Sequence, residues 1–227
     1  MRFLIHELPY ERPLAAGRFR YEHEGRPTGQ VEEWRLTTAT DGYHFLRVDV
    51  DGRAAGGLSR LYHLTIGPAG RPERLQFQAW GADGRTRGSV MFETSAITLS
   101  SVTNGQQADQ TMEAPAEYVF GVPVAAGLGL LAQAAGQRQE VTAAWLNDHW
   151  PFSLEKTTLP LRWREVKEAS LDGQAAGWRL LEIEKSKQVW TVWLDENDRP
   201  RQAAWNGWTA VETRYLDYGR VSIQKIP

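Results

Sequence analysis

The sequence predicts a mainly β fold, a curved antiparallel meander of about 10–12 strands that forms a half-barrel or open barrel around a central apolar helix. Two observations lead to this fold class. Apolar and polar residues alternate with a period of two through most of the chain, and short turns rich in glycine, proline and aspartate separate the alternating runs. One long apolar stretch, YVFGVPVAAGLGLLAQAAG at 118–136, interrupts the pattern.

The first part of the chain predicts an N-terminal meander over 17–113. Each of its alternating runs is bounded by a turn signal such as Asp-Gly, Asn-Gly or a Gly/Pro loop. The runs are GRFRYEHEGRPTGQVEEWRL (17–36), DGYHFLRVDVDG (41–52), RLYHLTIGPAGRPERLQFQAW (60–80) and RGSVMFETSAITLSSVTNGQ (87–106).

The apolar stretch predicts a helix over about 122–136, within a central helical segment at 122–148 that adds a short helix at QEVTAAWLN. Pro123 suits a first helical turn and Gly136 suits a helix end. The fourteen apolar residues of 119–132 are fewer than the roughly twenty that a membrane span needs. Two interpretations of the small residues on one helix face stay open: close packing on the sheet, or room for a ligand.

A C-terminal meander is predicted over 159–225, so that residues 1–227 form a single β domain. Its sequence resembles the first meander when 189–208 is placed over 61–80 without a gap. The Arg71-Pro72 turn then coincides with Arg199-Pro200, and Trp80 coincides with Trp208. We therefore expect equivalent turns and equivalent strands in the two halves, although shared turn chemistry alone could produce the match.

Composition narrows the partners and the location. The net charge is −2 with both signs interspersed, which argues against binding to nucleic acid. The absence of cysteine excludes disulfides and thiolate metal sites. The apolar run at the start, MRFLIHELPYERP, is too short for a signal peptide, so a cytoplasmic location is expected, with no transmembrane segment.

The chain shows no recognisable catalytic or metal motif. Its five histidines lack metal-ligand spacing, and no cofactor fingerprint precedes a helix in the required context, so neither a metal nor a cofactor is predicted. His23, His44 and His63 lie on nearby predicted strands and could converge only if the strand register allows it. An enzyme that uses histidines or carboxylates in a pocket is therefore kept as an alternative.

The predicted architecture resembles that of bacterial lipoprotein carriers and glycolipid-binding half-barrels. The resemblance lies in the helix near 122–136, in the meander VWTVWLDENDRPRQAAWNGWTAVETRYLDYG (189–219), and in its acidic Arg-Pro hairpin WLDENDRPRQAAW. It implies that an apolar or amphiphilic small molecule, lipid-like or glycolipid-like, binds between the sheet and the helix without catalysis.

The residues expected to bind this ligand lie on apolar strand faces or on the helix. They are Tyr21, His23, Trp34, His44, Leu46, Tyr62, Leu64, Leu128, Trp163, Trp178 and Trp193. The C-terminal strands carry apolar residues on both faces, so something must cover each face. The helix could cover one, and a ligand, the N-terminal segment or a second copy of the chain could cover the other. A structural protein that dimerises through this face is the remaining alternative.

Overall fold

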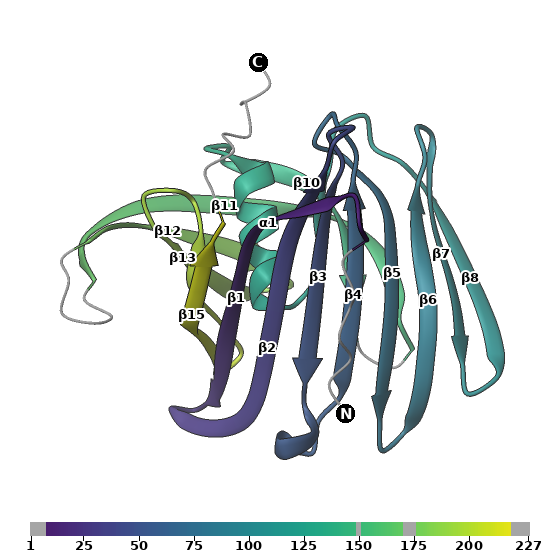
Figure 1. Ribbon diagram of the computed structural model, residues 1–227, viewed down its shortest axis with the longest axis horizontal. Coiled ribbons are helices and arrows are strands. Elements are labelled where there is room, and N and C mark those ends of the chain that lie inside the picture. Colours follow the sequence, from purple (N-terminus) through teal and green to yellow (C-terminus); the bar gives the residue numbers. More distant parts are fainter. Residues whose placement is uncertain (1–7, 149–150, 170–175, 219–227) are drawn as a thin grey trace. The chain divides into compact units, whose positions relative to one another are not determined.

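The computed structural model describes residues 8–148, 151–169 and 176–218. This part of the chain is mainly β, with fifteen strands, one α-helix and one short 3-10 helix (Figure 1). The strands follow a sequential hydrogen-bonded order whose two ends, β8 and β9, are not neighbours, so the sheet is open. The predicted fold class is confirmed, with fifteen strands in place of about ten to twelve.

The chain divides into two compact units, which are described separately. Unit 1 consists of Met1–Phe19, Gly29–Ala114 and Thr213–Pro227, and unit 2 consists of Arg20–Thr28 and Pro115–Glu212. The single domain predicted over 1–227 stays a prediction. In the described residues, no helix is both long enough and apolar enough to cross a membrane.

Unit 1 contains most of the first eight strands, in which β2 to β8 pair antiparallel in chain order. The elements are β1 (Glu11–His23), β2 (Arg26–Ala39), β3 (His44–Asp51), η1 (Arg53–Ala55), β4 (Ser59–Ile66), β5 (Pro72–Gly81), β6 (Gly84–Phe92), β7 (Ala96–Thr103) and β8 (Gln106–Glu113). These strands span Glu11 to Glu113, whereas the meander was predicted over 17–113.

One face of the unit 1 strands is apolar and buried. The strand register aligns Leu46, Leu64, Leu75, Val90 and Leu99 in one row across β3 to β7, and all five are buried. Because side chains alternate along a strand, the residues between them point to the opposite face. That second face is largely polar, and it holds the site described below.

Unit 2 contains the helix and most of the remaining strands. Its elements are β9 (Val119–Gly121), α1 (Ala125–Ala135), β10 (Glu140–Asn147), β11 (Ser153–Ala169), β12 (Ala176–Lys185), β13 (Gln188–Leu194), β14 (Pro200–Trp205) and β15 (Trp208–Asp217). The strands from β10 to β15 pair antiparallel in order, whereas β9 pairs parallel with β10. The last predicted strand residues, 219–225, lie outside the described residues.

Helix α1 confirms the helix predicted from the apolar stretch, although it is shorter than 122–136. It ends at Gly136, whose positive φ of 57° suits glycine and whose N–H donates to the carbonyls of Ala132 and Gln133. The helix packs against β9, β13 and β14, and the Leu128 side chain is fully buried. The apolar stretch is therefore core, as its composition indicates.

The second helix predicted within 122–148 is wrong, because residues 140–147 form strand β10. Four consecutive residues of this strand, Ala143, Ala144, Trp145 and Leu146, are buried. Burial on both faces removes the period-two alternation, and a short continuous apolar run does not distinguish a strand from a helix.

Close packing, and not a cavity, accounts for the small residues of α1. A Cβ atom added to Gly129 would lie 2.3 Å from Cγ of Pro200 on β14. A Cβ atom added to Gly127 would lie 2.4 Å from Cγ1 of Val122. Both glycines therefore allow close approach of the helix to its neighbours, and the space proposed for a ligand at Gly129 is filled.

The two predicted Arg-Pro turns are equivalent in detail. In the first, the Gly67 N–H donates to the Arg71 carbonyl over 2.8 Å, and in the second, the Asp195 N–H donates to the Arg199 carbonyl over 3.0 Å. The register also shifts at the same place, between Thr65 and Ile66 in β4 and between Trp193 and Leu194 in β13. This part of the expected repeat is confirmed.

The expected equivalence of Trp80 and Trp208 is wrong. Trp80 lies on β5, the strand that follows the first turn, whereas Trp208 lies on β15, one strand beyond the corresponding β14. The difference arises because β14 ends at Trp205 and the chain turns at Asn206-Gly207, which both have positive φ. The ungapped alignment does not account for this shorter strand.

Candidate functional site

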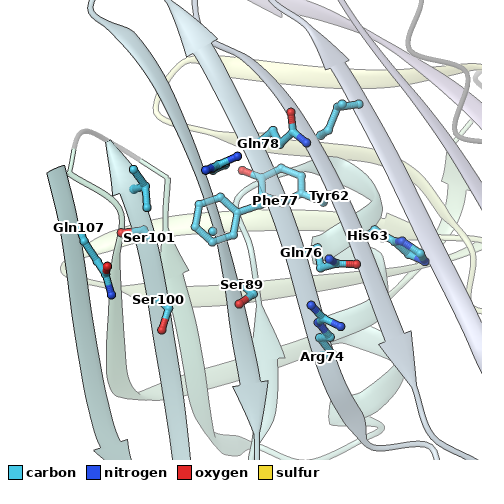
Figure 2. Close-up of a pocket in the computed structure, with 14 residues that line it drawn as sticks. Tyr62, His63, Arg74, Gln76, Phe77, Gln78, Ser89, Ser100, Ser101 and Gln107 are labelled. Carbon is cyan, nitrogen blue, oxygen red and sulfur yellow. The ribbon is translucent and has the colours of Figure 1, made fainter. Parts of the chain in front are cut away.

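A pocket of about 550 Å³ lies on the polar face of unit 1, across strands β4 to β8 (Figure 2). Its lining is formed by Leu61, Tyr62, His63, Arg74, Gln76, Phe77, Gln78, Arg87, Gly88, Ser89, Ser100, Ser101, Val102 and Gln107. A pocket of this volume is within the range that holds small-molecule ligands.

Strand register brings polar side chains into line across the pocket. His63 pairs with Gln76, Gln76 with Ser89, and Ser89 with Ser100, so that one row of four residues crosses β4 to β7. Figure 2 shows Gln76 and Arg74 on β5, between His63 on one side and Ser89 on the other. Residues far apart in the sequence thus present donors and acceptors to one space.

The pocket is positively charged. Its lining includes Arg74 and Arg87 but no aspartate or glutamate. Among the described residues, neither guanidinium has a carboxylate partner. Strands β4 to β7 contain one carboxylate, Glu73, which raises the pKa of the Tyr43 hydroxyl. Strand β8 adds Asp109 and Glu113, and Asp109 lies opposite Ser100 and accepts a hydrogen bond from Gln107 of the lining. The lining side chains themselves carry two positive charges and no negative charge. This local excess of positive charge contrasts with the net charge of −2 for the whole chain.

His63 lies at one edge of the pocket. Its ring centre is 6.0 Å from that of Phe45, and its Nε2 atom is buried and has no hydrogen-bond partner among the described residues. Burial lowers the pKa of His63, and the positive charges of Arg47 and Arg74 lower it further, although the carboxylate of Glu11 acts in the opposite direction. The imidazole is therefore neutral at pH 7, with a buried nitrogen available for a hydrogen bond.

Arg47, which is paired with His63 across β3 and β4, is held by a carboxylate from β1. Its two terminal nitrogens each lie 2.6 Å from an oxygen of Glu11, and the Thr37 hydroxyl donates to Glu11 over 2.5 Å. Burial raises the pKa of Glu11, but the hydrogen bonds from Arg47 and Thr37 outweigh it and leave the pKa below its ordinary value. Glu11 and Arg47 thus form a fixed charged pair beside His63.

The predicted site residues of unit 1 lie mainly on the opposite face. Among these, only Tyr62 contributes to the pocket lining. Trp34, Leu46, Tyr62 and Leu64 are buried, and His44 is half-buried with a pKa lowered by that burial. These residues share the face of the strands that is largely buried, and their role in binding stays a prediction.

The predicted site residues of unit 2 form separate contacts. Tyr21 stacks edge-on with Trp205, His23 lies beside Trp208, and Leu128 and Trp178 are buried. Trp163 donates from Nε1 to the Arg138 carbonyl, whereas Trp193 is half-buried on β13. Register places Trp163 opposite Leu181 and Trp193 opposite Leu180, so the two tryptophans lie on different faces of the sheet. Their role in binding stays a prediction.

The structure does not join the histidines into one site. His44 pairs with Ile66 and Thr38, whereas His63 pairs with Arg47 on the same sheet, and the parity of the register places the two histidines on opposite faces. In the described part of the chain, no group of three histidine or carboxylate side chains could hold a metal ion.

The pocket lacks the geometry of a serine nucleophile with a histidine base. His63 on β4 and Ser89 on β6 are separated by the whole of β5, or roughly 10 Å at the usual strand spacing. A nucleophile and its base must approach to about 3 Å. The enzyme alternative stays a prediction without a catalytic pair to support it.

Most of the pocket residues were not predicted as a site from the sequence. Arg74, Gln76, Arg87, Ser89 and Ser100 occupy positions that alternate with core residues and resemble a solvated strand face. Charge was the one signal in the sequence that could have indicated the pocket. The strands between Ser59 and Thr103 contain several arginines and a single carboxylate.

Comparison with known proteins supports the fold only. No family model and no curated protein matches the chain. It is similar to the solved structure of a β-barrel-like protein of a domain of unknown function, DUF1849, from Brucella abortus, with a TM-score of 0.55 and 9% identity over 92% of this chain and 99% of that chain. A structure of MucB in complex with MucA(peri) is 12% identical over 88% of this chain and 86% of that chain. Its TM-score of 0.19 is too low to indicate a shared fold.

The likeness to the Brucella protein indicates a β-barrel-like fold, without assigning a family. The resemblance to lipoprotein carriers and glycolipid-binding half-barrels is thus confirmed only at the level of that fold. The predicted cytoplasmic location and the dimer stay predictions.

Proposed function

We propose that this protein binds a small, hydroxylated anion without catalysis, and that the pocket on β4 to β8 is the binding site. The observation that carries the proposal is the lining itself, which combines Arg74 and Arg87 with no carboxylate. Guanidinium groups bind carboxylates and phosphates through paired hydrogen bonds.

The neutral part of the lining suits hydroxyl groups. Gln76, Ser89 and Ser100 supply amide and hydroxyl groups that both donate and accept hydrogen bonds. Such a mixture favours a sugar acid, a sugar phosphate or a polyol phosphate over an aliphatic acid. The separation of His63 from Ser89 by the whole of β5, and the lack of a three-ligand metal cluster among the described residues, favour binding over hydrolysis.

The lipid or glycolipid ligand predicted from the sequence is compatible with this proposal if its anionic head group binds in the pocket. The contact between Gly129 and Pro200 fills the space expected under the helix, which disfavours a tail there. An anionic lipid head and a free polyol phosphate share the chemistry that this pocket recognises. The two sources are distinguished by comparing dioctanoyl phosphatidylglycerol with glycerol 3-phosphate.

The test is isothermal titration calorimetry with glucarate, glucose 6-phosphate, glycerol 3-phosphate and dioctanoyl phosphatidylglycerol. Glucose is the neutral reference. We expect the anions to bind more tightly than glucose. Replacing both pocket arginines, Arg74→Gln with Arg87→Gln, should weaken anion binding by at least about tenfold, because the loss of even one charged hydrogen bond costs about 1.5–3 kcal/mol.

The matched control is Arg162→Gln, which removes an exposed arginine from β11 in unit 2. It changes the net charge without touching the pocket, so anion affinity should be retained. Anions that bind no better than glucose, or a pocket variant that binds as the parent does, would contradict the proposal. Circular dichroism and thermal unfolding verify that each variant is folded.

A further inference from the structure

We infer that the ligand carries a negative group at each end of a hydroxylated body of about hexose size. This inference rests on the proposed function and narrows its ligand class. The two pocket arginines are well separated. Arg87 pairs with Gln78 across β5 and β6, and Gln78 is four residues from Arg74 along β5. The two arginine positions are thus roughly 13 Å apart along the strands.

Neutral polar groups occupy the interval between the arginines. Arg74 pairs with Met91 on β6, and Ser89 lies on that strand between Met91 and Arg87. Gln76 lies opposite Ser89 on β5, and Ser100 lies opposite it on β7. The positive groups therefore mark the two ends of a polar row, rather than one shared cluster.

Each arginine is available to a ligand. Both side chains are exposed, and within the described ranges neither forms a hydrogen bond or an ion pair with another residue. By contrast, the neighbouring Arg85 donates to Gln78 Oε1 over 2.9 Å and is engaged within the protein. A ligand with one anionic group can pair closely with one end, whereas a ligand with two can engage both.

The size of the pocket agrees with a two-ended ligand. A volume of about 550 Å³ is far greater than a single phosphate or carboxylate fills. A six-carbon chain places its terminal anionic groups well apart and offers several hydroxyls to the glutamine and serine side chains between them. Two arginines that are only solvated surface charges would instead act independently of the ligand's second charge, which the following experiment measures.

The experiment compares fructose 1,6-bisphosphate with fructose 1-phosphate and fructose 6-phosphate by isothermal titration calorimetry on the intact chain. We expect the bisphosphate to bind at least tenfold more tightly than either monophosphate. Arg74→Gln and Arg87→Gln should each reduce the affinity for the bisphosphate by about tenfold, to the level of a monophosphate. Each monophosphate should be sensitive chiefly to one of the two substitutions.

A second pair of probes carries carboxylates in place of phosphates, so that a preference of the site for phosphate cannot explain the difference in affinity. Glucarate carries a carboxylate at both ends and gluconate at one, so the same difference in affinity is expected. Arg162→Gln is again the control, and its affinity for every probe should equal that of the parent.

The two levels of the proposal fail in different ways. If ligands with one anionic group bind and the corresponding ligands with two bind no more tightly, or if only one arginine affects the ligands with two, the site stands and the two-ended ligand is overturned. If no anion binds better than glucose, both the two-ended ligand and the proposed function are overturned.

Discussion

Glu11 and Arg47 form a bidentate ion pair, with two nitrogen–oxygen contacts of 2.6 Å and side chains that are 0% and 3% exposed. Thr37 donates to the same carboxylate and accepts from Arg47, which closes a three-residue network inside unit 1. The ion pair holds the first residue of β1 against β3, and Arg47 is the cross-strand partner of His63 in the pocket.

The first prediction concerns the stability of this pair. Glu11→Ala leaves a buried guanidinium without its partner and should lower the free energy of unfolding by about 3–5 kcal/mol. Arg164→Ala breaks the exposed pair with Glu182 and should cost at most about 1 kcal/mol. Urea unfolding followed by circular dichroism measures both.

A double replacement separates charge from packing at the same position. Glu11→Leu with Arg47→Met removes both charges, so it should recover part of the stability lost in Glu11→Ala. Equal small losses for Glu11→Ala and Arg164→Ala would show that the buried pair contributes no more than a surface pair.

The second prediction concerns the glycine that faces Pro200. Gly129→Leu improves helix propensity by about 1 kcal/mol, but its side chain must displace the proline ring. We expect a net destabilisation of roughly 1–3 kcal/mol from overpacking. Ala134→Leu, at an exposed position of the same helix, should be nearly neutral. If Gly129→Leu is as stable as the parent, there is free space beside Gly129, and the ligand-cavity interpretation of the helix would be supported.

The sequence predicts the elements of this fold better than its functional site. The helix was predictable because the apolar run 119–132 is followed by Gly136, which ends the helix with a positive φ, and because Pro123 lies just before the first helical residue, Ala125. Strand β10 was not, because Ala143 to Leu146 are buried on both faces and lose the period of two. Local signals therefore serve where alternation or end residues mark an element, and β10 has neither.

The pocket depends on register, which the sequence does not contain in local form. His63, Gln76, Ser89 and Ser100 become one row only after three strand pairs are aligned. A shift of one residue in any pair would send a side chain to the other face. The same parity places His44 and His63 on opposite faces, which no count of histidines could show.

The third prediction concerns the pH dependence of stability, through Glu212 in unit 2. Its Oε2 atom lies 2.8 Å from Nε of Arg201, but neither carboxylate oxygen has a hydrogen bond in good geometry. Burial raises the pKa of Glu212 from 4.5 to about 7, against the opposing charges of Arg201 and Arg199.

The sign follows from which state holds the proton. Between pH 4.5 and about 7 the folded protein keeps the Glu212 proton and the unfolded chain releases it, so stability falls as the pH rises. The favourable contribution of protonated Glu212 to the free energy of unfolding is fully present below pH 4.5 and is lost above about pH 7. A shift of this size corresponds to roughly 3 kcal/mol.

Glu212→Gln imitates the protonated form and should remove this loss. We expect the variant to gain roughly 3 kcal/mol on the parent between pH 5 and pH 8 in urea unfolding. Glu165→Gln, at an exposed position of β11, is the control and should follow the parent. A constant difference between Glu212→Gln and the parent at every pH would mean that Glu212 does not titrate in this range.

The fourth prediction concerns His63 and the pH dependence of ligand binding. Burial and the charge of Arg47 hold the pKa of His63 below its ordinary value in the free protein. A bound anion stabilises the imidazolium and raises that pKa, so binding takes up a proton at pH values between the free and the bound pKa. Anion affinity should therefore increase as the pH falls from about 7.5 to 5.5, with a slope of at most about tenfold per pH unit.

Glucarate is the suitable probe for this prediction, because its carboxylates remain ionised over most of this range. Titration in two buffers of different ionisation enthalpy counts the protons taken up on binding. His63→Gln should keep glucarate binding at pH 7.5 and lose both the proton uptake and the pH dependence. His44→Gln removes a half-buried histidine on the opposite face of the same sheet, so it should retain both. Proton uptake that persists in His63→Gln would place the titrating group elsewhere and leave His63 without a role in anion binding.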